Sequence, residues 1–459
     1  MDTTSPGDNL NRVAKILIDS GEAPTIERAL ELLEDYALTI EIGSEVARSP
    51  TLQAAVLTAV NAGRRCFLGG VQVVGDADID LKVPWRRCKT LCDAIMDLRG
   101  EIVSAASPDR PRMIVGDVED SATSDGLALR ATFDGWVAGV VPLDSGKRLP
   151  ERQEFTPSGV LAGALAVSEA FQSLRGNVLA GRRDVGLSLW RLEESTAWLS
   201  EARKGPELER LPSRLWIIGL GHLGQAFLWT LGFLPYAEAG DLELVLQDHD
   251  TLVDANASTS LLTFPEIIGE KKTRAMARWS EQRGFRTTLT ERRFAADFQV
   301  GGDDPPVALC GVDNAQARAA LEHPGFGRVI EAGLGGGTRE YLDFQMHTFP
   351  SKKSAQERWG LVAQEGSTNG LLERPAYRAL ASEGLDQCGL TTLAGRTVGA
   401  PFVGAAASAI VVAEALRMVP GDRRYEVVDG SLRSPEEPYS VVSNEATEPF
   451  NPGSTNVRR

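Results

Sequence analysis

The stretch RLWIIGLGHLGQAFLWTLGFLPYAEAGDLELVLQDHDTLVD, residues 214–254, decides the fold. It begins with an apolar run, Leu215–Ile218, whose length and β-branched content are typical of a buried parallel strand. A glycine turn and an amphipathic helix through Leu234 follow, and a second apolar strand spans Leu242–Leu246. Strand, glycine turn, helix and strand in this order predict an α/β, Rossmann-like fold: a mostly parallel sheet with helices on both faces.

The glycine turn also predicts a nucleotide site. Gly219, Gly221 and Gly224 have the G-x-G-x-x-G spacing. Because glycine has no Cβ, its backbone can approach a phosphate closely, and the following helix offers unpaired N–H groups to the anion. Asp248 and Asp250 end the second strand, where a carboxylate can accept a hydrogen bond from a ribose hydroxyl. On this stretch alone, NAD and ATP fit equally well.

Further motifs follow the glycine loop in order. Asn256 comes shortly after the acidic pair, and Lys272 closes the run IGEKK. Asp313 and Asn314 begin a D-N-x-x-x-R pattern at the end of a third apolar stretch. Together these motifs resemble the adenylation domain of the ubiquitin-activating enzyme superfamily, the ThiF/MoeB/HesA-like adenylyltransferases, over residues 211–430.

The resemblance implies ATP-dependent adenylation of a carboxylate, in which the carboxylate attacks the α-phosphate and pyrophosphate leaves. It implies that the glycines lie against the nucleotide and that Asp248 or Asp250 binds the ribose. Lys272 would neutralise phosphate charge, and Asp313 would bind Mg²⁺, which a hard carboxylate oxygen suits. Without the family context, Lys272 is a solvated surface lysine and Asp313 is a helix cap.

One position departs from the family pattern. The family follows its asparagine with an arginine that reaches the triphosphate, whereas this chain has Thr259 there. The missing charge would come from the N-terminal half or from Arg292 or Arg293, or else the chain only binds nucleotide. Asn256 and Asn314 either hydrogen-bond phosphate or hold their loops.

Cys388 is the candidate nucleophile. It stands in the run DQCGLTT, shortly before Pro401, and activating enzymes of the ubiquitin type carry their thioester cysteine in a similar context. A thiolate that attacks the acyl adenylate converts a mixed anhydride into a thioester. The alternative is a small buried hydrophobe. The remaining cysteines are expected to be structural: Cys66, Cys88, Cys92 and Cys310.

Composition narrows the class of protein. The chain has 459 residues and a net charge of −15, with 42% hydrophobic and 24% charged residues, so two or three ordinary globular domains are expected. The negative charge argues against binding to a nucleic-acid backbone. We see no apolar run of membrane-spanning length and no signal peptide, and we expect a cytoplasmic protein. Without a C-x-x-C pair, a structural zinc is not expected.

The composition and expected secondary structure along the chain divide it into four regions. We predict an N-terminal helical region over 1–63, a degenerate, inactive adenylation-like domain over 64–205, and the active domain with its cysteine-bearing crossover segment over 206–430. A tail rich in Ser, Pro, Glu and Asn over 431–459 is expected to be flexible. Within the second region, 187–202 is expected to be a helical connector.

An apparent internal repeat supports the degenerate copy. The run GVLAGALAVSEAF from Gly159 and the run GAAASAIVVAEAL from Gly404 share Gly, Ala and Glu at matching offsets, the glutamates being Glu169 and Glu414. Chance similarity of two small-residue helices is the alternative. A duplicated architecture, one inactive and one active adenylation domain packed as an intramolecular pseudo-dimer, resembles the activating enzymes of the ubiquitin type.

Three functions compete. The first is activation of a ubiquitin-like protein: adenylation of its C-terminal carboxylate, a thioester on Cys388 and transfer to a conjugating enzyme, in a bacterial antiphage pathway as the resemblance implies. The second is a sulfur-carrier adenylyltransferase of the ThiF/MoeB kind, whose members commonly carry C-x-x-C pairs that this chain lacks. The third is a nucleotide-binding module without turnover, which Thr259 favours. A dehydrogenase leaves Lys272 and Asp313 unexplained.

Overall fold

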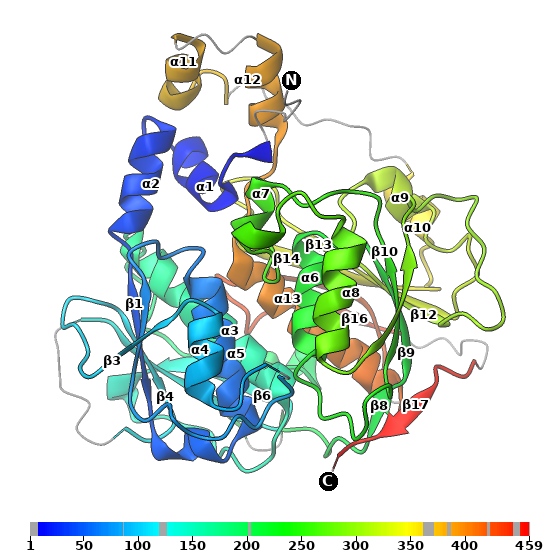
Figure 1. Ribbon diagram of the computed structural model, residues 1–459, viewed down its shortest axis with the longest axis horizontal. Helices are drawn as coiled ribbons and strands as arrows, with labels where there is room; N and C mark the ends of the chain where they lie inside the picture. Colours follow the sequence, from blue (N-terminus) through cyan, green and yellow to red (C-terminus); the bar gives the residue numbers. More distant parts are fainter. Residues whose placement is uncertain are drawn as a thin grey trace.

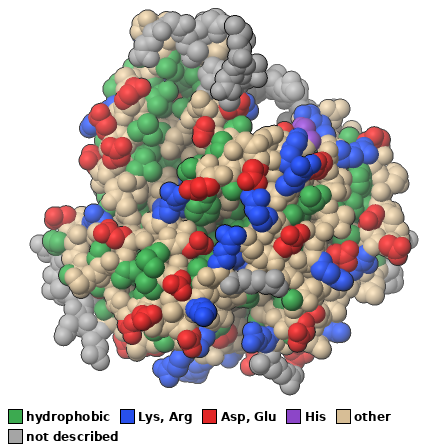
Figure 2. Space-filling model, in the orientation of Figure 1, with side chains coloured by type: hydrophobic (Ala, Val, Ile, Leu, Met, Phe, Trp, Pro, Cys, Tyr) green, Lys and Arg blue, Asp and Glu red, His purple; other side chains and the backbone are tan. Residues whose placement is uncertain are grey.

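The computed structural model describes residues 8–85, 87–118, 126–200, 203–360, 371–382, 387–419, 423–443 and 450–458. In Figure 1 the chain forms two α/β units side by side, the first drawn in blue to cyan and the second in green to orange. Acidic and basic side chains are intermixed over the face shown in Figure 2.

The first unit is a seven-stranded sheet in the order β3-β2-β1-β4-β5-β6-β7. The first five strands in that order are parallel, and β6 and β7 are antiparallel to their neighbours. The strands are β1 (Leu38–Ile42), β2 (Val71–Val74), β3 (Glu101–Val103), β4 (Arg112–Val115), β5 (Ala128–Asp134), β6 (Val137–Pro142) and β7 (Val185–Ser188).

The second unit has the sheet order β11-β10-β9-β12-β13-β14-β15-β16. Its first five strands are again parallel and the others antiparallel, so its first seven strands repeat the order and directions of the first sheet. The strands are β9 (Arg214–Ile218), β10 (Glu243–Gln247), β11 (Arg286–Thr290), β12 (Val307–Cys310), β13 (Arg328–Leu334), β14 (Asp343–Phe349), β15 (Tyr425–Ser431) and β16 (Tyr439–Val442).

Helices connect and cover the strands (Figure 1). The first unit contains α1 (Arg12–Ser20), α2 (Ile26–Glu34), α3 (Pro50–Gly63), α4 (Leu91–Asp97) and α5 (Thr156–Leu174). The second contains α6 (His222–Leu231), α7 (Asp254–Ala257), α8 (Lys272–Gln282), α9 (Ala315–Ala319), α10 (Ala355–Trp359), α11 (Pro375–Ser382), α12 (Gln387–Gly395) and α13 (Pro401–Met418). An α/β fold with mostly parallel sheets is thus confirmed.

Strand β9 shows why the sequence read as a fully buried strand. Leu215 and Ile217 face the large hydrophobic core, whereas Trp216 and Ile218 face a second cluster on the opposite side of the sheet. Successive side chains of a strand point to opposite faces. Because both faces are covered, the strand has no polar alternation.

The two units share one hydrophobic core. The rings of Phe171 on α5 and Phe402 on α13 lie 5.6 Å apart, and Trp229 Nε1 on α6 donates a hydrogen bond of 3.0 Å to Thr58 Oγ1 on α3. Among the described helices, α13 is long and apolar enough to cross a membrane, although the sequence analysis saw no such run, and 94% of it is buried inside the fold. It packs against α5 and α3 of the first unit and against α6 of its own unit.

Three expectations from the sequence were wrong in detail: those for the N-terminal region, for the connector and, as described below, for the tail. The helical region 1–63 contains β1, a central strand, which was missed because Glu41 interrupts its apolar run; Glu41 is buried and pairs with Arg112 at 3.0 Å. The expected connector helix over 187–202 begins instead with the end of β7 and continues as a 3₁₀ turn at Leu192–Ala197.

The tail from 431 onward, which was expected to be flexible, carries two strands. Strand β16 pairs with β15, and β17 (Ser454–Asn456) pairs antiparallel with β8 (Arg210–Pro212). A strand whose partner lies more than two hundred residues away gives no local signal, because pairing with that partner is what stabilises it.

The two helices of the apparent repeat have the same internal contact. Glu169 on α5 and Glu414 on α13 are both buried. Glu169 Oε2 accepts a hydrogen bond of 2.6 Å from the Gly181 N–H, shortly before β7, and Glu414 Oε1 accepts one of 3.2 Å from the Tyr425 N–H, where β15 begins. Each glutamate therefore ties its helix to the next strand of its own sheet.

Candidate nucleotide site

The glycine loop joins β9 to α6, and its three glycines differ in what surrounds them. Gly219 adopts a positive φ of 83°. A Cβ on Gly224 would collide with the carbonyl oxygen of Gly219, whereas a Cβ on Gly221 would meet no atom within 4 Å. Gly221 precedes α6 without a side-chain cap, so no side chain competes for the first N–H groups of the helix. The loop is therefore closely packed at Gly224 and has free space at Gly221.

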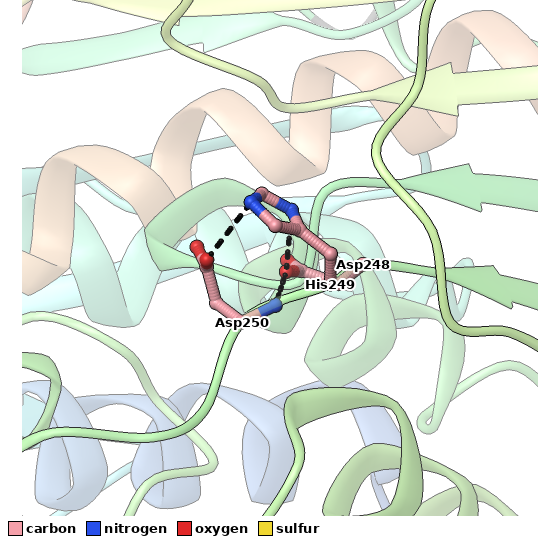
Figure 3. Close-up of side chains that lie close together, drawn as sticks. All are labelled: Asp248, His249 and Asp250. Carbon is pink, nitrogen blue, oxygen red and sulfur yellow. Dashed lines mark hydrogen bonds and ion pairs between the residues drawn. The ribbon is translucent and has the colours of Figure 1, made fainter.

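Asp248 braces this loop from the end of β10. Its Oδ2 accepts a hydrogen bond of 2.7 Å from the Leu220 N–H, and its Oδ1 accepts one of 2.8 Å from the Asp250 N–H. The side chain is 8% exposed. Asp248, His249 and Asp250 form a compact group (Figure 3), in which His249 Nε2 lies 3.2 Å from Asp250 Oδ1.

The side chain of Lys272 is mostly buried and paired with an acid, so it is not a solvated surface lysine. It begins α8, is 11% exposed, and its Nζ lies 3.0 Å from Asp250 Oδ2. Burial acts to raise the pKa of Asp250, but the charge and hydrogen bond of Lys272, with smaller contributions from His249 and Arg293, bring it below its ordinary value. An ammonium group is thus held beside the glycine loop by the second acid of the pair.

The two asparagines hold loops in this structure. Asn256 Oδ1 accepts a hydrogen bond of 3.0 Å from the Val253 N–H at the start of α7. Asn314 Oδ1 accepts one of 3.1 Å from the Ala317 N–H and caps α9. These contacts fit the loop-holding alternative for both residues.

Asp313 follows β12 at the same edge of the sheet. It is exposed, and no described residue donates a hydrogen bond to its carboxylate. The nearby Arg318 has a structural role: its Nε donates 2.9 Å to the Val312 carbonyl and lies 3.0 Å from Glu331, and its guanidinium stacks on Trp359 at 4.7 Å. Arg318 therefore holds the loop on which Asp313 stands.

Arg292 and Arg293, the candidate replacements for the missing arginine, have different partners. Arg292 pairs with Asp297 at 2.9 Å, and Arg293 Nη2 lies 3.1 Å from His249 Nε2. Thr259 is buried, with 6% of it exposed. Its position has no charge of its own, so any cation must come from another element.

Arg12, which the sequence analysis did not single out, also contacts the segment that carries Thr259. Its backbone N–H donates 3.0 Å to Ser258 Oγ, next to Thr259, and its Nη1 donates 3.4 Å to the Thr397 carbonyl. The pKa of Arg12 is lowered to about 10, first by burial and then by the charge of Arg396, while Asp8 and Asp313 act in the opposite direction. No local signal marks Arg12, because its contact with Ser258 spans 246 residues.

Cys388 lies on α12, in the crossover segment, but its side chain is outside the described residues. The segment docks on α1, where Tyr377 OH donates a hydrogen bond of 2.8 Å to Asp19 Oδ1. Among the other cysteines, Cys66 and Cys310 are buried in the core, and burial raises the pKa of Cys310 to about 12. Their structural assignment agrees with this burial.

We expect the stability of the fold to depend on pH through His222, the first residue of α6. The pKa of His222 is lowered to about 4, mainly by burial; a hydrogen bond with the Pro401 backbone opposes this shift, and the charge of Arg65 adds to it. The unfolded chain therefore takes up a proton between pH 6.5 and about pH 4 that the folded chain does not. We expect up to about 3 kcal/mol of unfolding free energy to be lost as the pH falls through this window. Urea denaturation of wild type and His222→Gln at pH 7 and pH 4.5 measures this; equal losses in both proteins would contradict it.

Two family models match the chain: the BilD C-terminal domain over residues 211–422 and the BilD N-terminal domain over residues 37–189. The bacterial E1-like protein BilD of Collimonas sp. (strain OK412) is 44% identical over 432 residues, which cover 94% of this chain and 93% of that protein. The chain belongs to the BilD family of bacterial E1-like proteins.

Solved structures are also similar to this BilD-family chain. E. coli MccB with ATP is 11% identical over 54% of this chain and 64% of that one, with a TM-score of 0.29. E. coli tRNA N6-threonylcarbamoyladenosine dehydratase, TcdA, is 15% identical over 45% of this chain and 85% of that one, with a TM-score of 0.27.

Proposed function

We propose that this BilD-family protein is an ATP-dependent activating enzyme for a ubiquitin-like protein. The observation that carries the proposal is the meeting of the glycine loop, Asp248 and the Lys272–Asp250 pair at the carboxyl ends of neighbouring strands. Sheet order reverses between β9 and β12, and ligands of open α/β sheets bind outside the carboxyl ends at such a point. The family relationship to a bacterial E1-like protein supports the reaction class.

The reaction has two steps. A C-terminal carboxylate oxygen of the ubiquitin-like protein attacks the α-phosphorus of ATP, and the bond to the bridging oxygen breaks so that pyrophosphate leaves with the electron pair. The Cys388 thiol then loses its proton, and the thiolate attacks the acyl carbon and expels AMP. The thioester is finally passed to a conjugating enzyme. We place this chemistry in a bacterial antiphage pathway, as the resemblance in sequence implies.

Asp313 is the proposed ligand for Mg²⁺. Its carboxylate is exposed and accepts no hydrogen bond from the described residues, whereas Asp248 and Asp250 already accept bonds from backbone N–H groups and Lys272. Asp313 therefore fits a hard cation better than the acidic pair does. The ion supplies charge neutralisation on the phosphates when bound.

Arg12 is proposed to supply the positive charge that Thr259 lacks. Its backbone is fixed to Ser258, and its charge interacts with that of Asp313, so its side chain lies on the nucleotide side of the loop. Arg12 is half-buried, and no carboxylate of the described residues lies at hydrogen-bond distance from its guanidinium, which keeps that group available for phosphate.

The first unit is proposed to be the inactive copy. The matching sheet orders support this, and so does the place that corresponds to the glycine loop. There, Glu154 Oε2 accepts bonds of 3.0 Å from Ser49 Oγ and from the Thr51 N–H, which fills the N-terminus of α3. A cavity of about 510 Å³ beside it is lined by Glu45, Arg148 and Glu151. The guanidinium of Arg148 lies 2.8 Å from Glu151, so the cation of this cavity is already paired with an acid.

ATP–pyrophosphate exchange with a ubiquitin-like protein tests the proposal. We expect Asp313→Ala to lower exchange roughly 100-fold or more, because metal-assisted charge neutralisation is lost. Cys388→Ala should retain exchange but form no thioester on a non-reducing gel. Exchange without a thioester in wild type would favour the sulfur-carrier adenylyltransferase, and ATP binding without exchange would favour the non-catalytic module.

A further inference from the structure

The end of α3 in the first unit reaches into the segment of the second unit that carries Thr259. Arg65, just after α3, is 3% exposed. Its guanidinium donates hydrogen bonds to three backbone carbonyls: Ala257 at 3.1 Å, Leu261 at 2.7 Å and Thr263 at 3.1 Å. Two of these acceptors flank Thr259, so one side chain of the first unit sets the course of this turn in the second.

Two neighbours of Arg65 contact the same segment. Asn61 Nδ2 donates a hydrogen bond of 3.0 Å to the Leu261 carbonyl. The guanidinium of Arg64 stacks over the ring of Phe264 with 4.2 Å to the centroid. Arg65 differs from both, because it alone binds carbonyls on each side of Thr259.

The charge of Arg65 has no acidic partner in the part of the chain that the structure describes. No carboxylate of the described residues forms an ion pair with it, and its Nε has no hydrogen-bond partner. Burial lowers the pKa of Arg65, and the neighbouring Arg64 lowers it further, yet a guanidinium stays protonated in proteins. A buried, unpaired cation is unfavourable unless another group compensates for it. The positive charge of Arg65 also lowers the pKa of His222, the first residue of α6, so the guanidinium lies near the start of that helix.

We propose that Arg65 is a positioning residue for the nucleotide site of the second unit. It fixes residues 257–261, and the hydroxyl of Ser258 within that segment accepts the Arg12 N–H at 3.0 Å. Arg65 thereby determines where Arg12 presents its guanidinium, without touching the nucleotide. The inference rests on the proposed function, and it makes the first unit a structural part of the active site.

Calorimetric titration of the full chain with Mg-ATP and with adenosine tests this inference. We expect Arg65→Met to weaken ATP binding about tenfold, the usual effect of losing hydrogen bonds from a charged group, and to leave adenosine binding unchanged. Adenosine has no phosphates for Arg12 to meet, so a general collapse of the site would weaken both ligands. Arg65→Lys should recover part of the ATP affinity. Arg64→Met, the matched control, should bind ATP as wild type does.

Ser258→Ala keeps the test decisive where Arg65→Met fails to fold, because it removes the hydroxyl that accepts the Arg12 N–H. The other bond of this hydroxyl is local, to the Ala255 carbonyl at 2.7 Å. Ser258→Ala should weaken ATP binding in the same direction, and its effect should be non-additive with that of Arg65→Lys. Wild-type ATP affinity in Arg65→Met or in Ser258→Ala would overturn the inference and leave the proposed function intact. Wild type that binds no ATP would overturn the proposed function and this inference with it.

Discussion

We expect Asp248→Asn to lower the affinity for ATP by about 100-fold, because one carboxylate makes two charge-assisted hydrogen bonds that shape the site. Oδ2 accepts from the Leu220 N–H and Oδ1 from the Asp250 N–H. An asparagine keeps one acceptor, but its amide nitrogen would face a second N–H donor. The glycine loop and Asp250 would both lose the hydrogen bonds that hold them. Any contact of the Asp248 carboxylate with a ribose would also be lost.

Asp254→Asn is the matched control for this experiment. Asp254 is an exposed carboxylate in the first turn of α7, and no described donor contacts it. Both variants carry the same loss of one negative charge. Titration with Mg-ATP should therefore separate them, and equal affinities would show that Asp248 does not organise the nucleotide site.

The parts of this site that the sequence predicted are local in the chain. The glycine loop, with Gly219 at a positive φ, is set by residues within one turn of one another. The roles of Asp250 and Lys272 came from the resemblance to the ubiquitin-activating enzyme superfamily, and in the structure Lys272 Nζ lies 3.0 Å from Asp250 Oδ2. Short-range patterns of this kind depend on backbone freedom and strand order, which are visible in one segment.

The parts that could not be predicted depend on contacts between the units. Arg12 meets Ser258 across 246 residues, and Arg65 meets the same segment across 192 to 198 residues. Before the fold is known, each is one arginine among many, with no periodicity or motif to mark it. Strand β1 was missed for a related reason, because the buried Glu41 is tolerated only where Arg112 pairs with it.

Glu414→Ala is expected to produce the largest loss of stability, about 3–5 kcal/mol of unfolding free energy, because it leaves a buried arginine without its acid. Glu414 Oε2 lies 2.5 Å from Arg417 Nη2, and each side chain is 1% exposed. Glu414 Oε1 also accepts the Tyr425 N–H at 3.2 Å, so the truncation leaves a second buried donor unpaired. Urea denaturation at pH 7 measures the change.

Glu31→Ala provides the control with the same chemistry and the same i, i+3 spacing. Glu31 pairs with Arg28 at 2.8 Å on α2, with the two side chains 58% and 49% exposed, so little stability should be lost. The double variant Glu414→Met/Arg417→Met should recover most of the loss, because neither charge then remains buried. Arg417 Nη1 also donates to the Leu189 carbonyl of the first unit. Glu414→Ala should therefore loosen both units together, and a loss confined to the second unit would show that this pair does not join them.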